Sequence, residues 1–208
     1  LYISGGKVFV RGKEIKLNDP AASLNEGMAF VSEDRRGVGL LLDEGIDWNI
    51  TFTAMQIQEK FIKKLFGGLI KWRDDKAVTK CTEDFIKALE IRCTGPKQRA
   101  VELSGGNQQK VALAKWMPHQ PQVLLLNDPT RGVDVETKRE IYIMLRQFAS
   151  DGKAVVLLSS DTPELVHLCD RVVVIREGRI VSELQRADLS EQAIVAAAVG
   201  AEPTVTAA

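Results

Sequence analysis

Several features that would narrow the class of this protein are scarce in its sequence. Its three cysteines, Cys81, Cys93 and Cys169, are odd in number and far apart, which argues against a disulfide framework or a zinc site and favours reduced thiols. No apolar run approaches the roughly 18 residues that span a membrane, and no signal-peptide pattern opens the chain. We therefore expect any association with a membrane to require a partner.

Net charge is absent as well. The 28 basic and 28 acidic residues cancel over 208 residues, so no global field draws the chain to nucleic acid or to anionic lipid. The length, with 45% apolar residues, fits one ordinary domain with a real core and a small subdomain. We expect a globular chain without a nucleic-acid partner.

The alternation of strand-like and helix-like segments predicts an α/β fold. The apolar run from Val123 to Leu126 is expected to be a strand buried on both faces of a parallel sheet. From about Asp47 to Ile91 the pattern favours amphipathic helix, with Phe61, Leu65 and Leu69 at intervals of four. The expected parts of the chain are N-terminal strands over 1–46, a helical subdomain over 47–117, the rest of the core over 118–199 and a disordered tail over 200–208.

Cap and turn residues predict the smaller elements. Before the helical block, the expected features are two strands within 7–16 turning at Gly12-Lys13, a helix from Asp19-Pro20 to Gly27, a buried strand over 28–32 and a polar turn over 33–37. After it, they are a helix over 105–117, a helix over 136–150, a strand over 154–158, a short helix from Pro163, a strand pair turning at Glu177-Gly178 and a helix over 187–199.

The most informative segment is Leu-Ser-Gly-Gly-Asn-Gln-Gln-Lys at residues 103–110. Ser104 is placed to cap a helix, and Gly105 and Gly106 let an anion approach the backbone closely. The unpaired N–H groups and the positive end of the helix dipole then face that anion. The octet therefore predicts a phosphate-binding helix start.

About 15 residues after this octet, an apolar strand ends in Asn127-Asp128-Pro129-Thr130. With that context the chain resembles the ATP-binding-cassette (ABC) ATPases, whose signature is Leu-Ser-Gly-Gly-Gln. It is most similar to the second half of the ATPase subunits of bacterial monosaccharide importers, in which the octet and Pro-Thr-Arg-Gly-Val-Asp (129–134) recur. The resemblance covers nearly the whole chain. It implies a P-loop NTPase-like core with a mostly parallel sheet, a small antiparallel β region and an inserted helical subdomain, truncated at the N-terminus.

The resemblance implies ATP and Mg²⁺ as cofactors, but three catalytic positions depart from the family pattern. Asn127 stands where the magnesium-organising Asp is usual, and Asp128 stands where the catalytic Glu is usual. Alternatively, Asp128 is the metal residue and Pro129 takes the place of the base, or the pair is only a turn that ends the strand. Ser160 replaces the usual switch histidine and is either catalytic or a passive hydroxyl.

The family's phosphate loop, Gly-x4-Gly-Lys-Ser/Thr (Walker A), does not occur in the sequence. In the family it lies upstream of the first strand pair, so we expect that it was removed with the N-terminal part. Loss of its strand would expose sheet edges, and edges recruit other chains. The isolated fragment is therefore expected to be inactive as an ATP hydrolase and to self-associate.

Glu33 stands where other cassettes have the glutamine of the Q-loop, the segment that faces the membrane partner. The turn from Glu33 to Arg36 is either a solvated charged turn or a coupling element. Arg131 either contacts a neighbouring half or pairs with a carboxylate. The tryptophans, Trp48, Trp72 and Trp116, are expected to pack in the subdomain core or at an interface.

In ABC dimers the signature of one half closes over ATP held by the other. The resemblance therefore implies that Ser104, Gly105, Gly106, Asn107 and Gln108 face ATP on a second nucleotide-binding domain. Asp134, in the D-loop string Gly-Val-Asp (132–134), would line the same interface.

The other implied partners are a membrane permease and, indirectly, a sugar-binding protein, with the chain at the cytoplasmic face of the inner membrane. Two alternatives remain. One is a non-catalytic regulatory or scaffold ABC module. The other is a soluble ABC ATPase of translation or DNA repair, which the neutral charge disfavours.

Overall fold

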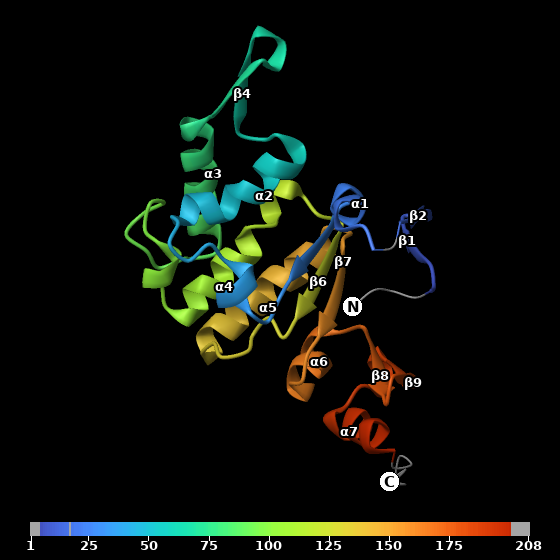
Figure 1. Cartoon of the computed structure of the whole chain (residues 1–208). Coiled ribbons are helices and arrows are strands. Elements are labelled where there is room, and N and C mark those ends of the chain that lie inside the picture. Colours follow the sequence, from blue (N-terminus) through green and yellow to red (C-terminus); the bar gives the residue numbers. More distant parts are fainter. Residues whose placement is uncertain (1–4, 17, 201–208) are drawn as a thin grey trace. The chain divides into compact units, whose positions relative to one another are not determined.

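The computed structural model describes residues 5–16 and 18–200. The chain divides into two compact units, one through Val156 and one from Leu157, and each is considered by itself below. Figure 1 shows the elements along the chain. The domain boundaries expected from the sequence stay predictions. In the described ranges no helix is both long and apolar enough to cross a membrane.

The chain opens with a small hairpin and a capped helix. Strands β1 (Val8–Val10) and β2 (Lys13–Ile15) pair antiparallel. Their turn is Arg11-Gly12, both with positive φ, one residue earlier than expected. Helix α1 (Pro20–Asn25) begins as predicted, because the Asp19 side chain accepts a hydrogen bond from the Ala22 N–H at 3.0 Å.

The central sheet has the strand order β3-β6-β7, formed by β3 (Met28–Val31), β6 (Val123–Asn127) and β7 (Ala154–Leu158). Strands β3 and β6 are parallel, with Ala29 opposite Leu124. This confirms the predicted parallel sheet. The sheet edges in the described part of the chain are β3 and β7, and self-association through such edges stays a prediction.

The expectation that Val123–Leu126 is buried on both faces is only half right. Leu124 and Leu126 are fully buried, whereas Val123 and Leu125 alternate with them and are half-buried. A strand places successive side chains on opposite faces, so the described elements cover one face of β6 completely and the other only in part.

A helical layer forms the main core of the first unit. Helices α2 (Ile46–Gln58), α3 (Asp75–Ala88) and α4 (Gly105–Ala114) belong to it, and α5 (Val135–Ser150) packs against α4 (Figure 1). Helix α4 is shorter than predicted, because Pro118 follows and has no N–H with which to continue a helix. The buried apolar cluster consists of Leu40, Ile46, Ile50, Ile91, Ala100, Leu103, Val111, Ala112 and Ala114.

The helical interpretation of residues 61–73 is wrong. This segment is a β-hairpin of β4 (Ile62–Leu65) and β5 (Ile70–Arg73), paired antiparallel. The turn contains Gly67 and Gly68, which have φ of 68° and 98°, and glycine adopts such angles without the penalty of a Cβ. The interval-of-four spacing therefore does not mark a buried helix face, and Leu69 is 85% exposed.

The second unit is a hairpin between two helices, as predicted. It contains α6 (Thr162–Leu168), β8 (Arg171–Arg176), β9 (Arg179–Gln185) and α7 (Glu191–Val199). Strands β8 and β9 pair antiparallel around the turn at Glu177-Gly178. Helix α7 begins later than expected, because Ser190 caps it after a short 3-10 turn. The predicted disordered tail lies almost wholly outside the described residues.

Candidate functional site

The start of α4 has the geometry of an open helix N-terminus. Ser104 is its N-cap, and its Oγ accepts hydrogen bonds from the backbone N–H of Asn107 at 3.4 Å and from the Asn107 side-chain amide at 2.9 Å. Gly105 and Gly106 follow in the first turn, where a helix offers its N–H groups no internal acceptor. Ser104 is exposed and Gly105 is half-buried, so this part of the signature faces outward.

The other signature residues are used inside the chain. The side-chain amide oxygen Oδ1 of Asn107 accepts a hydrogen bond from the backbone N–H of Arg92 at 2.9 Å. Gln108 is buried, and its amide donates to the Ala100 carbonyl at 3.0 Å. The surface available to a partner at this helix start is therefore Ser104 and Gly105, with Asn107 and Gln108 holding the helix in place behind them.

Both signature glycines lie where a side chain would collide with a neighbouring element. A Cβ on Gly106 would lie 2.5 Å from the Thr137 Oγ1 of α5. A Cβ on Gly105 would lie 2.9 Å from Nη2 of Arg35. The contact with the buried Thr137 requires glycine at 106, whereas the flexible Arg35 side chain can move away from a Cβ at 105.

The D-loop is held by the cap of α5. One Asp134 carboxylate oxygen accepts from the Thr137 N–H and the other from the Thr137 hydroxyl, each at 2.9 Å. The hydrogen bond from the Thr137 N–H lowers the pKa of Asp134 below its ordinary value, and the hydrogen bond from the Thr137 hydroxyl lowers it further. Asp134 is therefore ionised at neutral pH and stabilises the positive end of α5.

The charged turn that follows β3 reaches the D-loop. Asp34 caps a π-helical turn, Arg35–Gly39, by accepting from the Gly37 N–H at 2.8 Å. Arg131 pairs with Glu33 at 2.9 Å, so in this chain it contacts a carboxylate. Arg35 donates from Nη1 to the Arg131 carbonyl at 3.1 Å. The turn is therefore more than a solvated loop, because two of its side chains are bound to Arg131, which directly precedes the D-loop.

Two adjacent arginines lie beside the start of α4. Arg35 approaches Gly105, and Arg36 donates from Nε to the Gln108 side-chain oxygen at 3.4 Å. Burial, and after it the charge of Arg36, lower the pKa of Arg35 from its ordinary value. Within the described residues, the buried Nε of Arg35 has no hydrogen-bond acceptor. Two cations at the positive end of a helix dipole favour an anion.

We expect Arg35→Ala to loosen the D-loop, because the Arg131 carbonyl loses its hydrogen-bond donor. Amide hydrogen exchange at residues 131–133 should then become faster, by about 5- to 10-fold for the loss of roughly 1 kcal/mol. Arg36→Ala is the matched control, since Arg36 contacts Gln108 and not the D-loop. Equal protection of residues 131–133 in Arg35→Ala and in the unmodified chain would show that this hydrogen bond holds nothing in place.

A polar crevice of about 120 Å³ lies between α4 and the start of α5. Its size is well below the roughly 300–1,000 Å³ of small-molecule sites, so it does not enclose a nucleotide. Sequence reasoning missed Arg92, Lys110 and Thr137 as part of it, although Lys110 belongs to the octet. The lining residues are Arg92, Ser104, Asn107, Lys110, Asp134, Glu136, Thr137 and Glu140.

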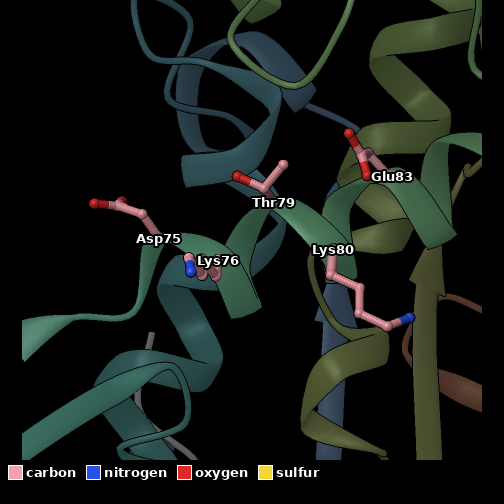
Figure 2. A pocket seen from close by; sticks show the side chains of 5 residues that line it. All are labelled: Asp75, Lys76, Thr79, Lys80 and Glu83. Carbon is pink, nitrogen blue, oxygen red and sulfur yellow. The ribbon is translucent and has the colours of Figure 1, made fainter.

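A larger hollow, of about 380 Å³, is no better a candidate. Its lining residues, Asp75, Lys76, Thr79, Lys80 and Glu83, all belong to α3. Figure 2 shows their side chains pointing in different directions along one helix, without converging. It has no opposite wall and offers no set of groups that would act together.

The residues in the Walker B position lie at a sharp turn. Asn127 ends β6, and Asp128 has φ of 44°, which aspartate tolerates better than most residues. The Asp128 carbonyl accepts from the Arg131 N–H at 3.1 Å. In the described residues no group of three or more His, Cys, Asp or Glu side chains forms a metal site. One carboxylate and one amide fit Mg²⁺ poorly by themselves, and their metal and catalytic roles stay predictions.

Ser160 lies in the second unit and is exposed. Its neighbours cap α6: Asp161 accepts from the Glu164 N–H at 3.3 Å, and the Ser159 hydroxyl bonds to the buried Glu164 carboxylate. The structure thus brings together the signature, D-loop and Glu33 turn within the first unit. A role for Ser160 stays a prediction.

Curated proteins of similar sequence are import ATP-binding proteins. The chain is similar to ribose import ATP-binding proteins RbsA. It is 46% identical over 197 residues to that of Rhodococcus jostii, covering 95% of this chain and 37% of the relative. For Bacillus cereus the identity is 36% over 200 residues, covering 96% and 39%. The chain thus spans under two fifths of the length of these relatives.

Solved structures show the fold. The chain is similar to the ATP-binding cassette MJ0796, in a dimeric post-hydrolysis state bound to ADP and Pi, with a TM-score of 0.70 and 20% identity. That match covers 88% of this chain and 74% of the other. For the ADP conformation of the cassette MJ1267, of an ABC transporter, the TM-score is 0.71 at 19% identity, covering 96% and 79%. The family model for the ABC transporter matches residues 2–131. This chain belongs to the ABC transporter family, with the P-loop NTPase-like fold of its ATPase cassettes.

Proposed function

We propose that this chain is the C-terminal nucleotide-binding half of the ATP-binding subunit of a monosaccharide ABC importer. In that role it presents its signature to ATP held by a second nucleotide-binding domain. The names of its relatives support sugar import, and the share of their length that it matches supports a half. The proposal includes a membrane permease as partner, with a sugar-binding protein behind it, at the cytoplasmic face of the inner membrane.

The observation that carries this proposal is the outward-facing start of α4. Ser104 offers a hydroxyl and Gly105 a backbone N–H, beside Arg35, and the adjacent crevice is too small for a nucleotide. Such a surface suits the exposed phosphate of a nucleotide that another domain holds. A Cβ at Gly106 would displace this helix start, because it would lie 2.5 Å from the Thr137 Oγ1.

The chain's own nucleotide site is proposed to be degenerate. Asn127 and Asp128 stand in place of an acidic pair, and Ser160 stands in place of a histidine. Asp128 is one methylene shorter than glutamate, which sets its carboxylate back by about 1.5 Å. A displacement of about 1 Å can lower a rate on the order of 10²-fold. The partner cassette would therefore supply the binding of ATP, and this chain would close over it.

The test compares Ser104→Ala with Asp128→Glu in the assembled ATPase, formed by this chain and its partner cassette. Ser104→Ala removes one hydrogen bond to a charged phosphate and is expected to lower the ATPase rate about tenfold or more. Asp128→Glu is expected to change it less than about twofold, because the site it restores lacks other parts. The rates are measured at saturating ATP.

The reverse ranking would contradict the proposal. So would steady ATP turnover by the purified chain without a companion cassette. If instead both variants leave the assembled ATPase unchanged, the chain acts as the non-catalytic scaffold module that the Asn127-Asp128 pair also suits.

A further inference from the structure

The β4–β5 hairpin has no part in the proposed function. It projects from the ends of α2 and α3 in the first unit (Figure 1). Its register places Leu65 opposite Ile70, Lys64 opposite Lys71, and Lys63 opposite Trp72. The turn beyond the first pair is Phe66-Gly67-Gly68-Leu69. Proceeding from the base toward the tip, the hairpin changes from basic to apolar.

The apolar end of the hairpin is exposed. Phe66 is 74% exposed and Leu69 is 85% exposed, and the pair behind them, Leu65 and Ile70, is about half exposed, at 47% and 48%. We call these four residues the apolar tip. Single exposed apolar residues are ordinary, but four that are contiguous at the end of a projecting hairpin mark an interaction surface.

A basic belt follows directly below the apolar tip. Lys64 and Lys71 are adjacent across the two strands, and both bond to Glu59, which lowers the pKa of Glu59 to about 2. Lys63 lies one pair further down, beside Trp72, which is 44% exposed. Lys63 pairs with Asp74 at 3.1 Å, and residues 59–75 contain five basic and three acidic side chains. The segment therefore carries a net positive charge, in which Lys64 and Lys71 share the single carboxylate of Glu59.

We propose that the β4–β5 hairpin inserts its apolar tip into the surface of an anionic phospholipid bilayer, with the lysines of its belt at the level of the headgroups. A strand advances about 3.4 Å per residue, so the tip extends roughly 5–10 Å beyond the belt. That is the depth to which interfacial segments bury their apolar side. Lysines and tryptophan are the residues favoured at the polar boundary.

The positive charge of the hairpin favours an anionic bilayer over a second copy of the chain as its binding partner. Two hairpins meeting tip to tip would bring two positive belts together, which is unfavourable, whereas an anionic surface attracts both. The proposed contact is direct, whereas the sequence led us to expect that any association with a membrane requires a partner. It stands independently of the proposed function, since it uses none of the residues around α4.

The experiment measures sedimentation of the purified chain with vesicles of phosphatidylglycerol and phosphatidylcholine, or of phosphatidylcholine alone. Binding is expected with the anionic vesicles and not with the neutral ones. Phe66→Ser combined with Leu69→Ser should lower the partition coefficient at least about tenfold, because the inserted apolar area is lost. Lys64→Gln combined with Lys71→Gln should lower it about tenfold as well and weaken its dependence on salt.

The control variants replace exposed residues that lie outside the hairpin. Ile180→Ser combined with Val199→Ser alters two residues that are each 70% exposed, and Lys7→Gln combined with Lys16→Gln removes two exposed lysines. Both pairs should leave vesicle binding unchanged. Absence of binding to anionic vesicles would overturn the proposal, as would equal loss in the controls. Concentration-dependent dimerisation that the tip variant abolishes, without vesicle binding, would assign the tip to a second copy instead.

Discussion

Gly106→Ala is expected to lower the ATPase rate of the proposed assembly with a partner cassette on the order of 10²-fold. The new Cβ would lie 2.5 Å from the Thr137 Oγ1, and 3.1 Å and 3.2 Å from the other side-chain carbons of Thr137. Thr137 is buried and bonded to Asp134, so it cannot move aside easily. The start of α4 must shift instead, and a shift of about 1 Å in a catalytic surface costs about that factor.

Removal of the obstacle should restore part of the lost rate. In the double variant Gly106→Ala with Thr137→Ala, Oγ1 and Cγ2 are gone, while the Thr137 backbone N–H still bonds to Asp134. We expect the double variant to be at least about fivefold faster than Gly106→Ala alone, since neighbouring substitutions that share one clash are not additive. Gly105→Ala is the milder comparison, because its Cβ meets the end of the flexible Arg35 side chain. Equal losses for both glycines, with no recovery, would refute the steric explanation.

Asp47→Ala is expected to destabilise the chain by about 3–5 kcal/mol, the usual cost of removing one partner of a buried ion pair. Asp47 is fully buried in the first turn of α2 and pairs with Arg73 and, at 2.8 Å, with Lys97. Arg73 is itself only 15% exposed and also lies over the Trp48 ring. Without Asp47 this guanidinium loses its buried counter-charge. Chemical denaturation at pH 7 measures the difference.

The same carboxylate should make stability depend on pH in acid. Burial alone would raise the pKa of Asp47, but hydrogen bonds from Lys97 and Arg73 outweigh it, so the folded-state pKa lies below the ordinary value. The contribution of Asp47 is therefore complete above the unfolded-state pKa of about 3.9. It is lost as the pH falls through the lower folded-state pKa. The difference in stability between the unmodified chain and Asp47→Asn should shrink in that range.

Asp75→Asn is the control for both measurements. Asp75 also pairs with Arg73, at 3.0 Å, but its side chain is 76% exposed, and exposed pairs contribute about 0–1 kcal/mol. A loss for Asp75→Asn as large as that for Asp47→Ala would show that burial of the ion pair is not what matters here.

Helix caps and turns could be predicted from the sequence wherever one or two residues determine the backbone conformation. The caps at Asp19 and Ser104 and the turn at Glu177-Gly178 are examples, since each depends on a side-chain acceptor or on a glycine at positive φ. The hairpin over 62–73 was missed because an apolar interval of four suits both a helix face and, by coincidence, a hairpin with its turn between.

In the candidate site as well, the sequence revealed some residues and only the structure revealed the others. Signature residues 103–110 and the D-loop were recognisable as strings, because the chemistry of phosphate binding needs glycine and a small cap at fixed spacing. The neighbours of those strings were not. Arg35 is 70 residues from Gly105 and Thr137 is 31 from Gly106, and only packing reveals that they approach the two glycines.

By itself, the sequence determined the family, the parallel sheet and the helix that begins at Ser104, because caps, glycines and apolar runs act over a few residues. Only the tertiary structure decided which side chains of the signature face outward, that Arg131 pairs with Glu33, and that the apolar residues around Gly67 form an exposed tip. These outcomes depend on contacts between distant segments, and no local pattern specifies which face of an element its neighbours will cover.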